Sequence, residues 1–75
     1  MEFKEGDMIY NTRTNALGYF DYFERNAPHL ICGKYIYSAL YEKGTSLWWS
    51  LDFTRLATPE DIAKVLAAMM TVSTK

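Results

Sequence analysis

Residues 46–53 read SLWWSLDF, and two adjacent tryptophans, Trp48 and Trp49, lie in the middle of this run. Aromatic residues favour strands, so the sequence predicts an extended segment over 47–53. Neighbouring side chains on a strand point to opposite faces of the sheet. The two indoles therefore cannot enter the same core, and one of them must face a different environment.

Alternation along this segment assigns the two tryptophans. One face is uniformly apolar, which identifies it as the core face, and it consists of Leu47, Trp49, Leu51 and Phe53. Trp48 shares the other face with Ser50 and Asp52. A β-bulge would exchange the faces, because a one-residue slip in register reverses every side chain. Trp48 is then either covered by a helix in a second small core or exposed in an aromatic patch.

A helix is the clearest local feature of the chain. Thr58 is a good N-cap, Pro59 suits the first helical position, and Asp61 has the spacing of a capping box. Helical spacing then connects five apolar residues, Ile62, Val65, Leu66, Met69 and Met70. The pattern predicts a helix over about 59–70 that packs this apolar face across a sheet or over one end of a barrel.

Upstream of this helix, turn-forming residues separate short aromatic and β-branched runs. We expect strands at 8–11, within 16–26, within 29–41 and at 47–53. Gly33 predicts a bulge or sharp bend in the third run, and Lys43 and Gly44 centre a hairpin connection over 41–46. The connections are too short for helical crossovers, so the strands must be antiparallel. The sequence predicts a mainly β fold, a bent sheet or small open barrel of four to five strands plus the C-terminal helix.

The chain carries more aromatic residues than one small core can hold, namely two Trp, six Tyr and four Phe. In the second run, alternation places Tyr19, Asp21 and Phe23 opposite Phe20, Tyr22 and Glu24. In the third run it places Ile31, Tyr35 and Tyr37 opposite Leu30, Cys32, Lys34 and Ile36. Exposed aromatic patches on small domains mark interaction sites. The candidate interaction surface consists of Trp48, Tyr41, Tyr22, Tyr19 and Tyr37.

Length and charge predict one small domain over residues 1–75, with its strands within 3–57. The net charge of −1 gives no electrostatic reason to bind nucleic acid or an anionic membrane. A lone cysteine excludes an intramolecular disulfide, and no apolar run approaches the roughly 20 residues of a membrane span. The first residues lack an apolar signal core, so we expect a soluble cytoplasmic protein.

Catalytic and metal-binding patterns are missing from the sequence. His29 and Cys32 occur once each, and residues three apart on a strand face opposite ways. We interpret them as a surface histidine and a buried cysteine. Neither phosphate-loop motif occurs, and a zinc site would need three or four ligands. We expect no enzyme activity, no cofactor and no metal, with a catalytic site completed between subunits as an alternative.

Two stretches resemble known groups of proteins. Residues 3–11, FKEGDMIYN, look like the first strand of small SH3-like barrels. Residues 51–65, LDFTRLATPEDIAKV, are similar to the end of short hypothetical proteins from phages and prophage-type mobile elements. The resemblance implies a small SH3-like antiparallel sheet or open barrel and an origin in a phage or mobile element.

The stretch ALYEK, residues 39–43, followed by the two tryptophans also resembles eukaryotic SH3 domains. In that family the corresponding motifs are separated by most of the domain, so the proline-peptide groove does not carry over. On a hairpin, however, Tyr41 and Trp48 could share a face.

These features predict a non-enzymatic binding module that uses its aromatic surface to bind a protein partner or a second copy of itself. The alternative is a barrel that binds single-stranded nucleic acid, because aromatic strands can stack unpaired bases. That mode also needs a positively charged groove. Here Arg13, Arg25, Lys34 and Lys43 are offset by Glu2, Glu5, Asp7, Asp21, Glu24, Glu42 and Asp52.

Overall fold

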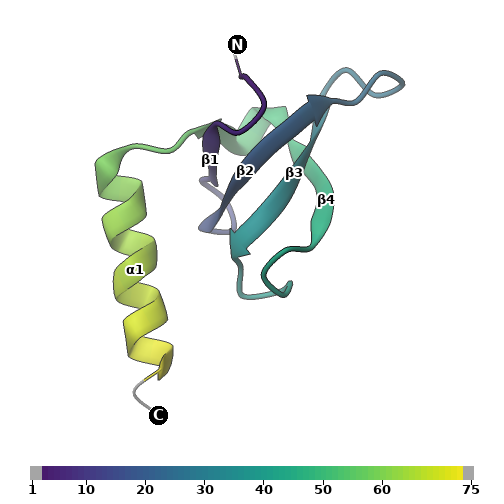
Figure 1. Cartoon of the computed structure of the whole chain (residues 1–75). Helices are drawn as coiled ribbons and strands as arrows, with labels where there is room; N and C mark the ends of the chain where they lie inside the picture. Colours follow the sequence, from purple (N-terminus) through teal and green to yellow (C-terminus); the bar gives the residue numbers. More distant parts are fainter. Residues whose placement is uncertain (1–2, 74–75) are drawn as a thin grey trace.

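The computed structural model describes residues 3–73, which form five antiparallel strands in one open sheet and one C-terminal helix (Figure 1). The order of the strands across the sheet is β4-β3-β2-β1-β5. The elements are β1 (Met8–Asn11), β2 (Ala16–Phe23), β3 (Leu30–Tyr37), β4 (Ser46–Ser50), the 3-10 turn η1 (Leu51–Phe53), β5 (Thr54–Leu56) and α1 (Pro59–Ser73). The predicted fold class is confirmed.

Three boundaries differ from the prediction. The run over 47–53 is not one strand, because η1 breaks it and releases β5 to pair with β1. A hydrogen bond of 2.6 Å from Thr54 Oγ1 to the Ser50 carbonyl closes this turn. The third strand ends at Tyr37, which leaves a longer connection to β4 than expected. The helix continues to Ser73, beyond the predicted end at residue 70.

Two register shifts between β2 and β3 change which side chains share a face. Phe20 pairs with Gly33 and Tyr22 with Cys32, so Asp21 is an extra residue in β2. The bulge places Tyr19 and Tyr22 on the same face, because their partners Lys34 and Cys32 are two residues apart on β3. The alternation predicted for the second strand is therefore wrong beyond Phe20.

The second shift has the same effect on β3. Tyr35 pairs with Gly18, but Tyr37 pairs with Leu17, so Ile36 is the extra residue. Tyr37 leaves the face of Tyr35 and packs with Ile36 against the cluster beneath α1. Gly33 lies beside the first shift, but the extra residue belongs to the partner strand.

The main core lies on one face of the sheet around Trp49, which is 1% exposed. Its other buried members are Phe3, Ile9, Ala16, Phe20, Ile31 and Tyr35. Leu47 and Leu51 pack against this cluster, as the alternation predicted, whereas Phe53 lies in η1 and is exposed. The assignment of Trp49 to the core is confirmed.

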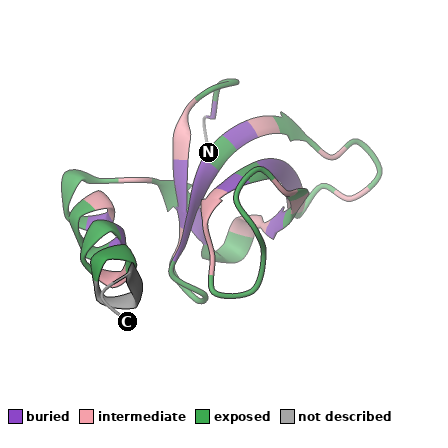
Figure 2. Ribbon diagram, turned by 60° about the horizontal axis from the view of Figure 1, so that its bottom comes forward, coloured by how far each residue is buried: buried purple, intermediate pink, exposed green. Residues whose placement is uncertain are grey.

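A second, smaller core lies between α1 and the outer face of the sheet, which is the face opposite the main core. Its buried members are Tyr10, Leu17 and Val65, and Ile62 packs against them. The predicted apolar face of the helix is covered only in part, because Leu66 and Met70 are 52% and 67% exposed. Figure 2 shows a narrow buried stripe along α1 and an exposed surface over most of the helix.

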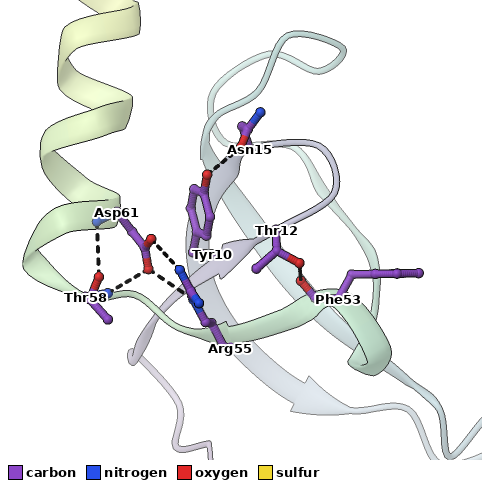
Figure 3. A network of polar contacts seen from close by, with 7 residues as sticks. All are labelled: Tyr10, Thr12, Asn15, Phe53, Arg55, Thr58 and Asp61. Atoms are coloured by element: carbon purple, nitrogen blue, oxygen red, sulfur yellow. Dashed lines mark hydrogen bonds and ion pairs between the residues drawn. The ribbon is translucent and has the colours of Figure 1, made fainter.

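Figure 3 shows the polar network that fixes the start of α1. Thr58 Oγ1 accepts a hydrogen bond of 3.1 Å from the Asp61 backbone, and Asp61 Oδ2 accepts one of 3.0 Å from the Thr58 backbone. The predicted capping box is confirmed, with aspartate in place of the usual glutamate. Arg55 donates to both carboxylate oxygens of Asp61, at 3.3 and 2.7 Å, and so ties β5 to the helix.

Candidate interaction surface

Three aromatic side chains are exposed together on the outer face of the sheet, and we name Tyr19, Tyr22 and Trp48 the aromatic face. Their exposed fractions are 44%, 54% and 62%. They share this face because Tyr19 pairs with Lys34, while Tyr22 and Trp48 both pair with Cys32. The helix occupies another part of the same outer face, over Tyr10 and Leu17.

A continuous row runs across three strands from Tyr22 through Cys32 to Trp48. Adjacent strands lie about 5 Å apart, so the Tyr22 and Trp48 backbones are separated by roughly 10 Å. The two rings flank Cys32, which is only 6% exposed although it points away from the main core. The row therefore presents two aromatic rings over a small buried thiol.

A hydrogen bond orients Trp48. Its Nε1 donates to Glu24 Oε2 over 3.0 Å, and Glu24 follows directly after β2. The bond fixes the polar edge of the indole and leaves most of the ring open to solvent, since the residue is 62% exposed. Of the two environments left open for Trp48 by the sequence, the structure has the exposed one.

Cys32 also affects the electrostatics of the row. The Cys32 side chain raises the pKa of the Tyr22 hydroxyl, first through a hydrogen bond and then through its charge, and partial burial and the carboxylates Glu24 and Asp21 add smaller effects in the same direction.

The other two predicted surface residues lie elsewhere. The Tyr41 ring stacks on Tyr35 at a centroid distance of 5.1 Å, and Tyr35 stacks on Trp49 at 4.6 Å. Tyr41 thus caps the side of the sheet that holds Trp49, and the expectation that it could share a face with Trp48 is wrong. The β3–β4 connection is longer than a tight hairpin, which lets the Tyr41 ring lie over Tyr35 while it stays exposed. Tyr37 is half-buried against the cluster under α1.

Two polar residues belong to this surface and were not among the predicted site residues. Lys34 is exposed and lies between Tyr19 and Ser46 in the register. Glu24 holds the Trp48 indole. Alternation along β3 places Lys34 on the same face as Cys32, so the sequence does indicate that Lys34 lies on the outer face. Nothing in the sequence indicates the contact between Glu24 and Trp48, because it depends on the pairing of three strands.

His29 and Cys32 occupy the predicted environments, an exposed and a buried one. Within residues 3–73, no three side chains of the His, Cys, Asp and Glu types lie close enough together to hold a metal ion. In the same part of the chain, no helix has the length and apolar character needed to cross a membrane.

Comparisons with known proteins identify no relative: no protein-family model matches the chain, and neither a curated protein nor a solved structure is significantly similar to it.

Proposed function

We propose that this chain is a non-enzymatic binding module that holds a protein partner on the aromatic face. One observation carries the proposal: α1 covers part of the outer face of the sheet, while Tyr19, Tyr22 and Trp48 remain exposed beside one another on the same face. A packed β-sheet normally buries only one of its faces in so small a domain. The exposed rings of Tyr19, Tyr22 and Trp48 on the second face contribute little to the buried core, so we assign them a role in binding.

The chemistry of the aromatic face suits a protein partner. Tyrosine and tryptophan are the residues that most often dominate the free energy of protein interfaces. Each ring offers a large apolar area at a low cost in side-chain entropy, and the Glu24 contact already restrains Trp48. Lys34 and Glu24 supply opposite charges at the border of the face, where charged groups select partners.

Binding of single-stranded nucleic acid is the alternative, and the observation in its favour is that Lys34 is exposed beside Tyr19 in the register. Against it, the carboxylate of Glu24 accepts a hydrogen bond from the Trp48 indole and so adds a negative charge to the aromatic face. Phosphate contacts need several cations, whereas carboxylates offset the cations of this chain. Protein binding is therefore preferred.

The proposal also includes a cytoplasmic location, an origin in a phage or mobile element, and a relationship to SH3-like barrels. These rest on the sequence features described above. The strand order and the short turn between β4 and β5 are compatible with a small open barrel.

A direct test uses the full chain with a photo-crosslinking amino acid at position 22 in cells of the native host. The captured protein is then purified and titrated with the wild type, Trp48→Ala and Tyr41→Ala. Tyr41 is the matched control, since it is an exposed aromatic residue on the opposite side of the sheet. We expect Trp48→Ala to weaken binding at least about tenfold and Tyr41→Ala to leave it unchanged.

The same titration with single-stranded oligothymidylate separates the two functions. Binding that weakens steeply with added salt would support the nucleic-acid alternative. If Trp48→Ala and Tyr41→Ala weaken partner binding equally, the partner does not bind at the aromatic face.

A further inference from the structure

The strand β4 forms one edge of the sheet and pairs with β3 on one side. In the part of the chain that the structure describes, no other strand pairs with it. Figure 1 shows α1 next to β1 and β4 at the far end of the sheet, so the helix does not cover the edge formed by β4. Among the described residues, the only backbone group on the unpaired edge of β4 with a hydrogen-bond partner is therefore the Ser50 carbonyl, which accepts from Thr54 Oγ1.

The register shows which residues offer these groups. The pairing of β3 and β4 is flanked by a hydrogen bond from Tyr35 N–H to the Thr45 carbonyl at 2.8 Å and one from Leu51 N–H to the His29 carbonyl at 2.9 Å. Antiparallel strands bond through alternate residues, so Leu47 and Trp49 bond to β3. Ser46, Trp48 and Ser50 therefore turn their N–H and C=O groups outward, with the Ser50 carbonyl also accepting from Thr54 Oγ1.

This edge lacks the usual protection against strand pairing. Natural proteins protect edge strands with charged residues, proline, bulges or a covering element. The strand β4 reads SLWWS, with no charge and no proline, and its pairing with β3 is regular. The opposite edge strand, β5, has three residues, carries Arg55 and leads directly into α1. The contrast points to β4 as the edge that accepts a further strand.

The sequence of β4 also fits a copy of itself. In an antiparallel pair with its two-fold axis at Trp48, each Trp48 lies opposite the other and Ser46 lies opposite Ser50 of the second copy. Because the strand has no charged residue, no charge is placed opposite itself. Small serines on both sides leave room for the two indoles. The outward N–H and C=O groups of Trp48 are then exchanged between the copies.

We propose that the protein forms a two-fold dimer by antiparallel pairing of β4 with β4 of a second copy, centred on Trp48. The pairing extends the sheet across the axis and brings both outer faces to the same side. The two aromatic faces then meet at the Trp48 pair and form one surface twice as large. This inference goes beyond the proposed function, because the dimer forms whether or not a partner protein binds the aromatic face.

The oligomeric state is tested by sedimentation equilibrium of the full chain from about 10 μM to about 1 mM, the range of a small interface. Trp48→Glu and Trp48→Lys each place like charges on the axis and should weaken association at least about tenfold. An equimolar mixture of these two variants should associate again, because the charges are then opposite. Leu66→Glu is the control, since Leu66 is an exposed apolar residue on α1.

Amide hydrogen exchange of the wild type tests the pairing without any substitution. The amides of Leu47 and Trp49 should be protected at every concentration, whereas those of Ser46 and Trp48 should gain protection only as the dimer forms. A monomer at the highest concentration would overturn the proposal, as would association abolished by Leu66→Glu. A dimer with unprotected Ser46 and Trp48 amides would also overturn it. Crosslinking from position 22 tests the proposed function separately, because Tyr22 lies on β2 and not on the β4 edge.

Discussion

The indole of Trp49 lies so close over Gly18 that a Cβ atom at residue 18 would be 2.7 Å from Trp49 Cζ2 and 2.5 Å from the Lys34 carbonyl oxygen. Gly33 faces the other part of the same ring, because a Cβ atom there would be 2.8 Å from Trp49 Nε1. Two glycines on adjacent strands thus form the slot that receives the tryptophan. This relationship explains why a strand region rich in large residues contains glycine at these two positions.

Gly18→Ala should therefore destabilise the protein by about 1–3 kcal/mol, the usual cost of overpacking a core. The Lys34 carbonyl belongs to the sheet backbone and cannot move aside without breaking the pairing. Urea denaturation measures the change in free energy of unfolding. Tryptophan fluorescence in the native state should shift as well, since the indole must move. A variant as stable as the wild type would show that Trp49 has another place to pack.

The two tryptophans should respond differently to truncation. Trp49→Ala removes the centre of the main core and should cost about 3–5 kcal/mol, most of the stability of so small a domain. Trp48→Ala removes an exposed ring and should change stability by less than about 1 kcal/mol. Trp49→Phe should cost much less than Trp49→Ala, because it keeps an aromatic ring in the slot and leaves a smaller cavity. Both variants remove the buried Nε1–H, which has no hydrogen-bond partner among the described residues. Comparable losses for Trp48→Ala and Trp49→Ala in thermal denaturation would contradict the assignment.

Local patterns in the sequence predict much of this architecture. The capping residues Thr58 and Asp61 act within one turn of helix, so their roles follow from spacing alone. The opposite orientations of Trp48 and Trp49 follow from alternation within a single strand. Strand β1 is predicted to the residue because polar turn residues enclose it.

The features that the sequence does not predict depend on contacts between distant segments. The bulge at Asp21 arises from the match between β2 and β3, and it alone places Tyr19 beside Tyr22. The stacking of Tyr41 on Tyr35 depends on the path of the β3–β4 connection. Helical spacing identifies Leu66 as part of an apolar face, but it cannot show that no strand covers this part of the helix, where Leu66 is exposed.

Partial coverage of α1 leads to a test along the helix. Val65 is 2% exposed against Tyr10 and Leu17, whereas its neighbour Leu66 is 52% exposed. Val65→Ala removes two buried methyl groups and should cost about 1.5 kcal/mol of unfolding free energy, while Leu66→Ala should change it by less than about 0.5 kcal/mol.

Truncation before Thr58 should expose the surface that Val65 covers and cause aggregation. A soluble fragment of residues 1–57 that melts cooperatively would show that the helix is dispensable for folding.

Asp61 should make stability depend on pH. Burial disfavours its charged form, but the hydrogen bonds from Arg55 and then Thr58 outweigh this effect and lower the pKa of the carboxyl. A depressed folded pKa means that the stabilisation is complete above the ordinary aspartate pKa of about 3.9 and is lost as pH falls through the lower folded value. Asp61→Asn should be less stable than the wild type at neutral pH and should lose less on acidification. Asp52→Asn, at an exposed position, is the control for general charge effects.

Cys32 is 6% exposed and lies between Tyr22 and Trp48 in the strand register, so its reactivity should report on the aromatic face. A thiol reagent such as a maleimide should label the native protein slowly, at the rate at which the row opens. Trp48→Ala removes one flank and should accelerate labelling several-fold, while the melting temperature changes little. Tyr41→Ala, on the other side of the sheet, should leave the rate unchanged. Equal labelling of the wild type and Trp48→Ala would show that Trp48 does not cover the thiol, and acceleration by Tyr22→Ala alone would assign the cover to Tyr22.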